Sequence, residues 1–247
     1  LLGRHVARRA RDLVVVGGTP GGIACAVRAA REGLSVLLVQ HTRHIGGMLA
    51  NSLFQWDALY GGHRAPIFNE YAHMIEEHYR ITYGEKSPQY RVARFMQTHY
   101  PMSIFEPSVA EREFNRLVAA EKNITLLLAH YPSAVTREGA LLRGVTLRVY
   151  GASAEIKVSA LAFADCTYEG DLAALAKVPY RVGREGRDEY GEPHAGKVFC
   201  NTSSKPGPKD AIEGRLNLHQ YAHSQGNVDP VSPFTADGAI QAYNYRF

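Results

Sequence analysis

The hydrophobic residues near the N-terminus form two short unbroken runs separated by a stretch of small residues. Residues 12–16 read Asp-Leu-Val-Val-Val and residues 35–39 read Ser-Val-Leu-Leu-Val. Unbroken runs of this length, rich in β-branched residues, are typical of strands buried on both faces. Between them the alanine-rich segment 23–31 predicts a helix, with Gly33 just past its end. The pattern is a β-α-β unit, which implies parallel strands and a right-handed crossover.

Further along the chain the pattern predicts two longer helices and a group of strands. We expect helices over 66–80 and 107–122, the second opening with Pro107, and a strand over 124–128. Residues 133–164 indicate a β-meander with glycines near its turns and a last strand at 160–164, before a short helix near Leu172. Segments 41–62 and 83–101 are expected to be irregular, and 201–238 to form surface loops.

Composition agrees with an α/β domain containing a parallel sheet. The 247 residues are 45% hydrophobic and 21% charged, which allows one large domain or one domain with an insertion. The formal net charge of +4 comes with no nucleic-acid recognition motif, so we expect no nucleic-acid partner; it suits an anionic cofactor. No apolar run reaches membrane-spanning length, and the compartment stays open between the cytoplasm and export.

Cysteine usage excludes several classes of site. Cys25, Cys166 and Cys200 are an odd number, far apart, with no C-x-x-C pair. This spacing indicates neither a disulfide scaffold nor a zinc site, and it argues against the disulfide-reductase type of redox enzyme. We expect no metal.

The turn between the first strand and the first helix reads Gly-Gly-Thr-Pro-Gly-Gly over residues 17–22. A glycine turn that opens a helix is an anion site, because helix N-terminal amides face the ligand and glycines let a pyrophosphate approach the backbone. Thr19 replaces the middle glycine of the G-x-G-x-x-G pattern, and Gln40 occupies the place of the acid that usually holds a ribose. The alternative is a turn that only packs a helix on a sheet.

Two further segments extend this motif to a family resemblance. They are 46–48, Gly-Gly-Met, and 165–171, Asp-Cys-Thr-Tyr-Glu-Gly-Asp. Together with 12–26 they resemble the bacterial FAD-dependent oxidoreductases of the glutathione-reductase-like fold, whose D-A-T-Y-E-G-D motif has alanine where Cys166 stands. The resemblance covers most of 12–195 and returns at 240–246. It implies a Rossmann-like, three-layer FAD/NAD(P)-binding fold with a parallel sheet, a β-meander and an insertion.

The resemblance also implies where the cofactor FAD binds. Glycine-turn residues would line its pyrophosphate, Gln40 would take the ribose position, the Gly46–Gly47 loop would follow it towards the flavin, and the 165–171 turn would lie beside the dinucleotide. The predicted cofactor residues are Gly17, Gly18, Thr19, Pro20, Gly21, Gly22, Gln40, His41, Gly46, Gly47, Met48, Asp165 and Thr167.

The resemblance suggests how the chain is divided. We expect an FAD-binding domain made of 12–50 and 106–176, an insertion at 51–105 that contributes to the substrate region, and the start of a substrate or cap region at 177–247. Family members usually run well beyond 247 residues. We therefore expect an N-terminal fragment, its remainder lying in a C-terminal half or a partner chain.

Candidates for chemistry each have a plainer interpretation. The acids Asp165, Glu169 and Asp171 suit helix capping and cofactor contact better than proton transfer, Asp171 being the favoured cap. His41 and His44 flank the loop before Gly46, but their spacing fits covalent flavin attachment poorly. Other candidates for a pocket or a ligand set are Trp56, Asp57, Arg91, Arg94, His99, Tyr100, Arg181, Arg184, Arg187, His219 and His223.

The sequence as a whole predicts an FAD-dependent oxidoreductase that transfers a hydride from an unknown small organic molecule to the flavin, with reoxidation by an unknown acceptor. No residue is assigned as the catalytic base. Two alternatives stay open: an NAD(P)-dependent dehydrogenase that uses the same turn, and a non-catalytic dinucleotide-binding fragment.

Overall fold

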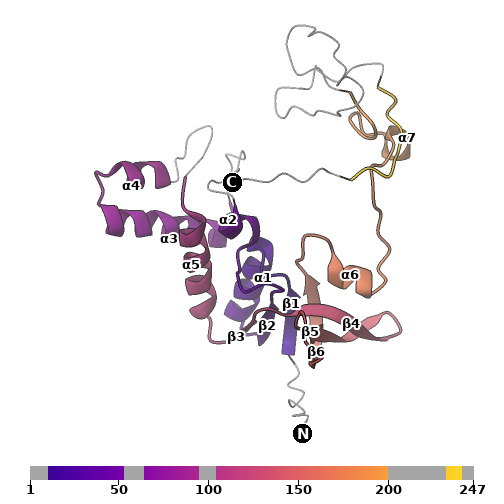
Figure 1. Cartoon of the computed structure of the whole chain (residues 1–247), viewed down its shortest axis with the longest axis horizontal. Helices are drawn as coiled ribbons and strands as arrows, with labels where there is room; N and C mark the ends of the chain where they lie inside the picture. Colours follow the sequence, from indigo (N-terminus) through magenta and orange to yellow (C-terminus); the bar gives the residue numbers. More distant parts are fainter. Residues whose placement is uncertain (1–10, 53–63, 95–103, 200–231, 241–247) are drawn as a thin grey trace. The chain divides into compact units, whose positions relative to one another are not determined.

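A computed structural model describes residues 11–52, 64–94, 104–199 and 232–240 of the chain (Figure 1). The chain divides into two compact units, one of Leu1–Val178 with Arg246–Phe247 and one of Pro179–Tyr245. The first unit contains all the named strands and every helix but one, so it is described first.

The first unit is built on a six-stranded mixed sheet of order β3-β2-β1-β6-β5-β4. Its strands are β1 (Arg11–Val16), β2 (Val36–Val39), β3 (Ile124–Leu127), β4 (Tyr131–Glu138), β5 (Leu141–Arg148) and β6 (Glu155–Asp165). Strands β3, β2, β1 and β6 run parallel, and β4, β5 and β6 form an antiparallel meander. The predicted α/β fold with a parallel sheet and a β-meander is confirmed.

Strand β6 belongs to both parts of the sheet. Its first half pairs antiparallel with β5 through 155–159, and its second half pairs parallel with β1 through 160–165. The predicted last strand at 160–164 is therefore the second half of one continuous strand. This continuity carries the chain from the meander to the carboxyl end of β1, where the turn after β6 meets the glycine turn.

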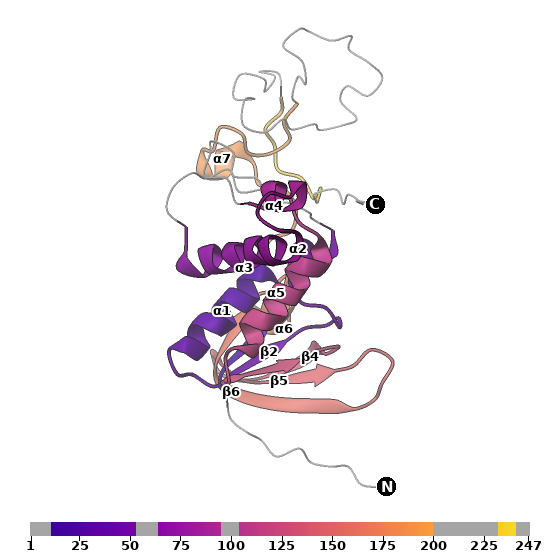
Figure 2. The ribbon, with the colours of Figure 1, turned by 90° about the vertical axis from the view of Figure 1, so that its left-hand side faces the viewer.

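Helices α1 (Pro20–Arg31) and α5 (Pro107–Ala119) pack on one face of the parallel strands (Figures 1 and 2). The meander side of the sheet has its own apolar cluster. Along β1, Val15 faces the helices while Val14 and Val16 face the other cluster, and β2 alternates in the same way. Because both faces are covered, the strands read as unbroken apolar runs instead of alternating ones.

Helices α3 (Pro66–Tyr83) and α4 (Pro88–Ala93) come from the predicted insertion, and they share the helix-side core of the sheet. The ring of Tyr71 on α3 stacks on Phe114 of α5 with centroids 3.8 Å apart, and its hydroxyl donates to the carbonyl of Ala110 at 2.7 Å. Arg31 at the end of α1 is bonded to Glu70 on α3. The described part of 51–105 is thus packed into the first unit.

Two short helices contradict the expected irregular segments. Helix α4 lies within 83–101, where Ser87 accepts a hydrogen bond from the Tyr90 N–H and Pro88 occupies the first helical position. This is a capping signal that the sequence interpretation missed. Helix α2 (Gly47–Asn51) lies within 41–62, and Gly46 in the left-handed conformation precedes it. The remaining short helices are α6 (Asp171–Leu175) and α7 (Arg187–Tyr190).

The described part of the second unit gathers around residues 232–237. The Phe234 N–H donates to the Lys197 carbonyl at 3.0 Å, and Arg184 and Asp237 form a β-bridge. Ser232 is buried. The described residues 232–238 are irregular and mostly exposed, as expected for surface loops, and their backbone is hydrogen-bonded to 184–187 and 197–199. Residues 200–231 lie outside the described part.

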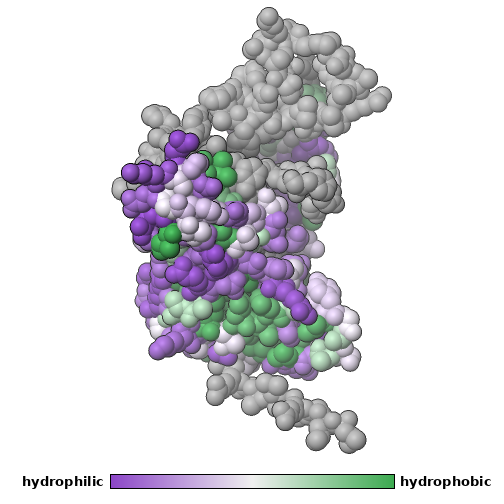
Figure 3. Space-filling model, turned by 60° about the vertical axis from the view of Figure 1, so that its left-hand side comes forward, coloured by the Kyte–Doolittle hydropathy of each residue, from purple (hydrophilic) through white to green (hydrophobic). Residues whose placement is uncertain are grey.

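Strands β3 and β4 are the edge strands of the sheet over the described residues, and Ile124, Leu126 and Leu127 on β3 are only half-buried. Figure 3, in which the left-hand side of Figure 1 comes forward, shows hydrophobic residues gathered below the hydrophilic surface of the helices. Among the described helices, none combines the length and the apolar character needed to cross a membrane.

Candidate cofactor site

The glycine turn between β1 and α1 is packed so tightly that two of its positions accept only glycine. Gly17 has φ +109°, and a Cβ there would lie 2.4 Å from the Cys166 backbone. A Cβ at Gly22 would lie 1.9 Å from the Gly17 carbonyl oxygen. Gly17 therefore brings β1 against the end of β6, and Gly22 lets α1 approach the turn.

Thr19, which replaces the middle glycine, is the N-cap of α1. Its hydroxyl oxygen accepts a hydrogen bond from the Gly22 N–H at 3.2 Å and donates one to the Cys166 carbonyl at 2.9 Å. The side chain thus ties the turn to β6. Pro20 has no N–H, and within the described part of the chain the N–H groups of Thr19 and Gly21 have no hydrogen-bond partner. Two amides are left for an anion at the positive end of a twelve-residue helix.

Gln40, which follows β2, is buried and turned towards the glycine turn. Its side-chain oxygen accepts a hydrogen bond from the Gly18 N–H at 2.8 Å, and its amide nitrogen donates to the Thr42 hydroxyl at 2.9 Å. The predicted ribose contact of Gln40 stays a prediction. What the structure adds is that this side chain already supports the turn from behind.

Replacing Gln40 with methionine keeps the length of the side chain and removes its acceptor. The buried Gly18 N–H is then left unpaired, and we expect the free energy of unfolding to fall by about 1–3 kcal/mol, measured by urea denaturation. Thr42→Ala is the matched control: at an exposed position it removes the partner of the Gln40 amide nitrogen and two hydrogen bonds with the His44 backbone, all of which water can replace, and should cost less than about 1 kcal/mol. Equal stability of Gln40→Met and the wild type would contradict this role.

The Gly46–Gly47 loop meets the same turn. The Gly46 N–H donates to the Gly18 carbonyl at 2.7 Å, and Gly46 has φ +100°. A Cβ at Gly47 would lie 2.1 Å from the Tyr168 hydroxyl, which accepts a hydrogen bond from the Met48 N–H at 2.9 Å. The loop is therefore held between the glycine turn and the segment after β6.

The segment after β6 is organised by one carboxylate. Asp165 accepts hydrogen bonds from the Thr167 N–H at 3.0 Å, the Thr167 hydroxyl at 2.7 Å and the Ala173 N–H at 2.8 Å. The Thr167 hydroxyl oxygen in turn accepts from the Asp171 N–H at 2.9 Å. The expected capping of α6 by the Asp171 side chain is wrong: Asp165 and Thr167, brought back by the tight turn, cap the helix.

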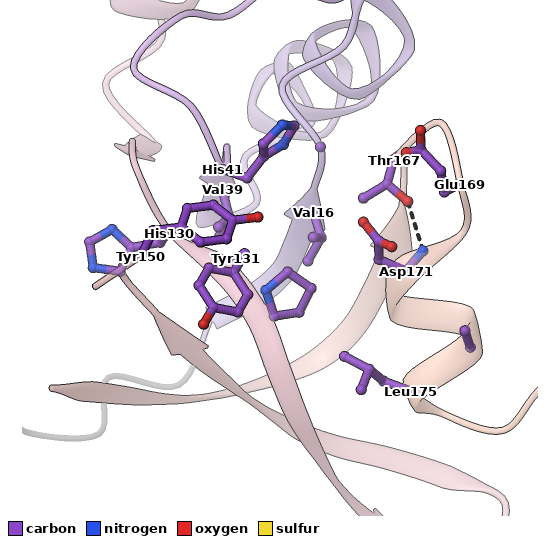
Figure 4. A pocket seen from close by; sticks show the side chains of 13 residues that line it. Val16, Val39, His41, His130, Tyr131, Tyr150, Thr167, Glu169, Asp171 and Leu175 are labelled. Atoms are coloured by element: carbon purple, nitrogen blue, oxygen red, sulfur yellow. Dashed lines mark hydrogen bonds between the residues drawn. The ribbon is translucent and has the colours of Figure 1, made fainter. Parts of the chain in front are cut away.

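A pocket of about 620 Å³ opens at the carboxyl ends of β1 and β2 (Figure 4). On one side lie Thr167, Glu169 and Asp171 of the segment after β6; on the other lie side chains that follow β2, open β4 and follow β5. The second group is His41, His130, Tyr131 and Tyr150. Gly17 and Val16 form part of the lining between them. The pocket thus joins the start of the glycine turn to the 165–171 segment predicted to accompany it, while the Gly46–Gly47 loop lies outside its lining.

Three of the polar or aromatic side chains in the pocket were not predicted: His130, Tyr131 and Tyr150. The rings of Tyr131 and Tyr150 stack with centroids 4.3 Å apart, and His130 Nδ1 lies 2.7 Å from the Leu128 carbonyl. Ala129, with φ +59°, marks the strained connection that turns this segment over the sheet, where its N–H donates to the Thr42 carbonyl at 2.8 Å. A positive φ at alanine is not visible in a sequence.

The comparison with protein families decides the assignment. Residues 12–246 match the family described as FAD dependent oxidoreductase. The matched range includes the glycine turn, the Gly46–Gly47 loop and the 165–171 segment. The chain belongs to this family. Its cofactor is FAD, and the resemblance inferred from the sequence is confirmed.

Solved structures give a set of distant likenesses to this FAD dependent oxidoreductase. L-proline dehydrogenase from P. horikoshii is 12% identical, with a TM-score of 0.47 over 72% of this chain and 59% of that one. THI4 from Thermovibrio ammonificans is 14% identical, with a TM-score of 0.46 over 71% and 66%. Glycerol-3-phosphate dehydrogenase from Bacillus halodurans, complexed with FAD, is 13% identical, with a TM-score of 0.45 over 68% and 37%.

The chain therefore spans less than two thirds of each of these three proteins. No curated protein matches the chain.

The histidines of this family member differ in their surroundings. His41 is exposed and lines the pocket. His44 Nδ1 lies 2.9 Å from a carboxylate oxygen of Glu111 on α5, so its ring contacts the helix side of the fold.

Met48, the last residue of the predicted loop, is exposed, and its N–H is hydrogen-bonded to the Tyr168 hydroxyl. Among the described residues, no cluster of three or more metal-binding side chains occurs.

The candidate arginines are largely accounted for by structural contacts. Arg181 pairs with Glu185 and Glu189, Arg184 with Asp237, and Arg187 lies over the Phe234 ring. Arg94 lies 3.8 Å from Glu76 on α3. The remaining candidates Trp56, Asp57, His99, Tyr100, His219, His223 and Cys200 lie outside the described residues, as does 241–246.

Proposed function

We propose that this protein binds FAD across the glycine turn and transfers a hydride from a small organic substrate to the flavin. The observation that carries the proposal is the meeting of three segments, at 17–22, 46–48 and 165–171, which are hydrogen-bonded to one another. Beside them, Gly17 and Thr167 line a pocket at the carboxyl ends of β1 and β2. A plain structural turn would not need the second and third segments.

The residues present fit the pyrophosphate of FAD. The N–H groups of Thr19 and Gly21 are available at the N-terminus of α1, and a Cβ at Gly21 would meet nothing closer than the Thr19 hydroxyl oxygen at 3.9 Å. Negative charge is favoured there by the helix dipole.

The pocket suits the adenosine part of the cofactor. Tyr131 and Tyr150 offer aromatic surface to a base, while His41 and His130 offer ring nitrogens. Because the Gln40 side chain is bonded to Gly18 and Thr42, the carboxylates of Glu169 and Asp171 are the better-placed acceptors for ribose hydroxyls. We include them in the proposed site beside the predicted Gln40.

When bound, FAD supplies the hydride acceptor, and the protein binds, orients and shields it. The N–H groups of Thr19 and Gly21, which would bind the pyrophosphate, and the pocket would together fix the adenosine end of the cofactor. The Gly46–Met48 loop would follow it away from the pocket, towards the flavin. The substrate region is proposed to use 51–105 and 177–247, and no described side chain is assigned as the catalytic base.

The test is anaerobic reduction of the FAD-loaded protein by classes of hydride donor, such as amino acids, 2-hydroxy acids and sugar alcohols. We expect one class to bleach the flavin absorbance, more slowly when the transferred hydrogen is deuterium. Bleaching by NADH or NADPH alone would favour the nicotinamide-dependent alternative. If dithionite bleaches the flavin but no organic donor or nicotinamide does, the non-catalytic alternative is favoured.

A further inference from the structure

Two cysteines from distant parts of the sequence lie near each other behind the glycine turn. Cys25 lies on α1, one helical turn after Gly22, and Cys166 follows β6 directly. Each of the two side chains influences the pKa of the other. A Cβ at Gly22 would lie 3.0 Å from the Cys166 Cβ, so α1 lies against this side chain. Both cysteines are half-buried at the edge of the helix-side core.

The backbone holds Cys166 in this position from both sides. Its N–H donates to the Val16 carbonyl at 2.7 Å, and its carbonyl accepts the Thr19 hydroxyl at 2.9 Å. Cys25 is fixed by the helix that Thr19 caps. The two cysteines therefore belong to two elements that the fold already joins.

We propose that Cys25 and Cys166 are a modification site: an oxidisable thiol pair that closes to an internal disulfide when the protein meets a low-molecular-weight disulfide such as oxidised glutathione. The link would join α1 to the segment after β6, directly behind the cofactor turn. This inference does not depend on FAD binding or on hydride transfer. The pair does not need C-x-x-C spacing, because the fold brings together two cysteines that are far apart in the sequence.

The step is an ordinary thiol–disulfide exchange. The thiolate of one cysteine attacks a sulfur of oxidised glutathione, which forms a mixed disulfide and releases one glutathione thiolate. The second cysteine thiolate attacks the protein sulfur of the mixed disulfide and releases the second glutathione. Two protons leave the cysteines, and the electron pair ends on the two glutathione molecules, so that the protein pair is oxidised and glutathione disulfide is reduced.

The surroundings make this exchange slow at neutral pH. Burial raises the pKa of Cys25, and burial with the nearby Cys25 and Asp165 raises the pKa of Cys166 to about 11. Since the thiolate is the attacking species, the rate is expected to increase as the pH rises towards that value. The pair is therefore suited to sustained oxidising conditions and not to rapid signalling.

The experiment uses the full chain with Cys200→Ser, so that Cys25 and Cys166 are the cysteines present. After incubation with oxidised glutathione, we expect the mass to fall by two hydrogen atoms, peptide mapping to find the Cys25–Cys166 link, and Tm to rise on the order of 10 °C. Dithiothreitol should reverse all three changes.

Two further variants keep the test decisive. In the Cys200→Ser background, Cys25→Ala and Cys166→Ala should each show no mass loss and no rise in Tm; alanine suits both places, one in a helix and one that is alanine in the family motif. The proposal is overturned if the Cys200→Ser protein keeps two free thiols, if each thiol carries its own glutathione, or if the only links join two protein molecules.

Discussion

The Gly22→Ala variant is expected to lose both stability and FAD binding. Its Cβ would lie 1.9 Å from the Gly17 carbonyl oxygen, an atom of the backbone that cannot rotate away. Helix α1 must then move off β1, which disturbs the core residues Ile23 and Val27 beneath it. We expect the free energy of unfolding to fall by about 4 kcal/mol or more, measured by urea denaturation, with loss of flavin uptake.

Gly21→Ala is the matched control for this variant. It adds the same methyl group one position earlier, where the nearest neighbour of a Cβ outside the adjoining backbone would be the Thr19 hydroxyl oxygen at 3.9 Å. Since alanine favours helix over glycine, stability should rise by up to about 1 kcal/mol. Equal stability of Gly22→Ala and Gly21→Ala would show that the close approach of α1 to the turn is wrong.

The Asp165→Ala variant is expected to have the second largest effect. One carboxylate accepts three hydrogen bonds, two from Thr167 and one from Ala173, and all three donors lose their partner. Because hydrogen bonds to a charged group contribute more than neutral ones, we expect a loss of about 3 kcal/mol in the free energy of unfolding. FAD affinity should fall as well, since Thr167 lines the pocket.

Asp171→Asn provides the comparison that separates the two capping assignments. Asp171 is exposed, and its backbone N–H, not its carboxylate, takes part in the turn. Its substitution should therefore change the free energy of unfolding, measured by urea denaturation, by no more than a helix-dipole contribution of about 0.5 kcal/mol. A larger loss in Asp171→Asn than in Asp165→Ala would restore Asp171 as the cap and contradict the assignment made from the structure.

The β-α-β unit was predictable because its signals are local. Unbroken apolar runs, an alanine-rich helix and glycines at the turn each act within a few residues. The convergence of 17–22, 46–48 and 165–171 was expected only from the family resemblance. The hydrogen bonds Gly46 to Gly18, Thr19 to Cys166 and Met48 to Tyr168 now give it a physical basis.

The parts that were missed depend on long-range contacts or on capping. The Ser87–Pro88 signal for α4 was present in the sequence but was not used. Tyr131 and Tyr150 reach the pocket because of the way the β-meander folds, and no local pattern in the sequence predicts that arrangement. The engagement of Gln40 with Gly18 is likewise a tertiary contact.

The central claim is that the glycine turn and the adjoining pocket bind FAD through its adenosine diphosphate half. The direct measurement is titration of the full chain with FAD and with FMN, which lacks the adenosine monophosphate part, followed by flavin fluorescence. The account predicts one FAD per chain, bound on the order of 100-fold more tightly than FMN, a difference of about 2.7 kcal/mol. Equal affinity for FMN and FAD, or no uptake of FAD, would contradict it.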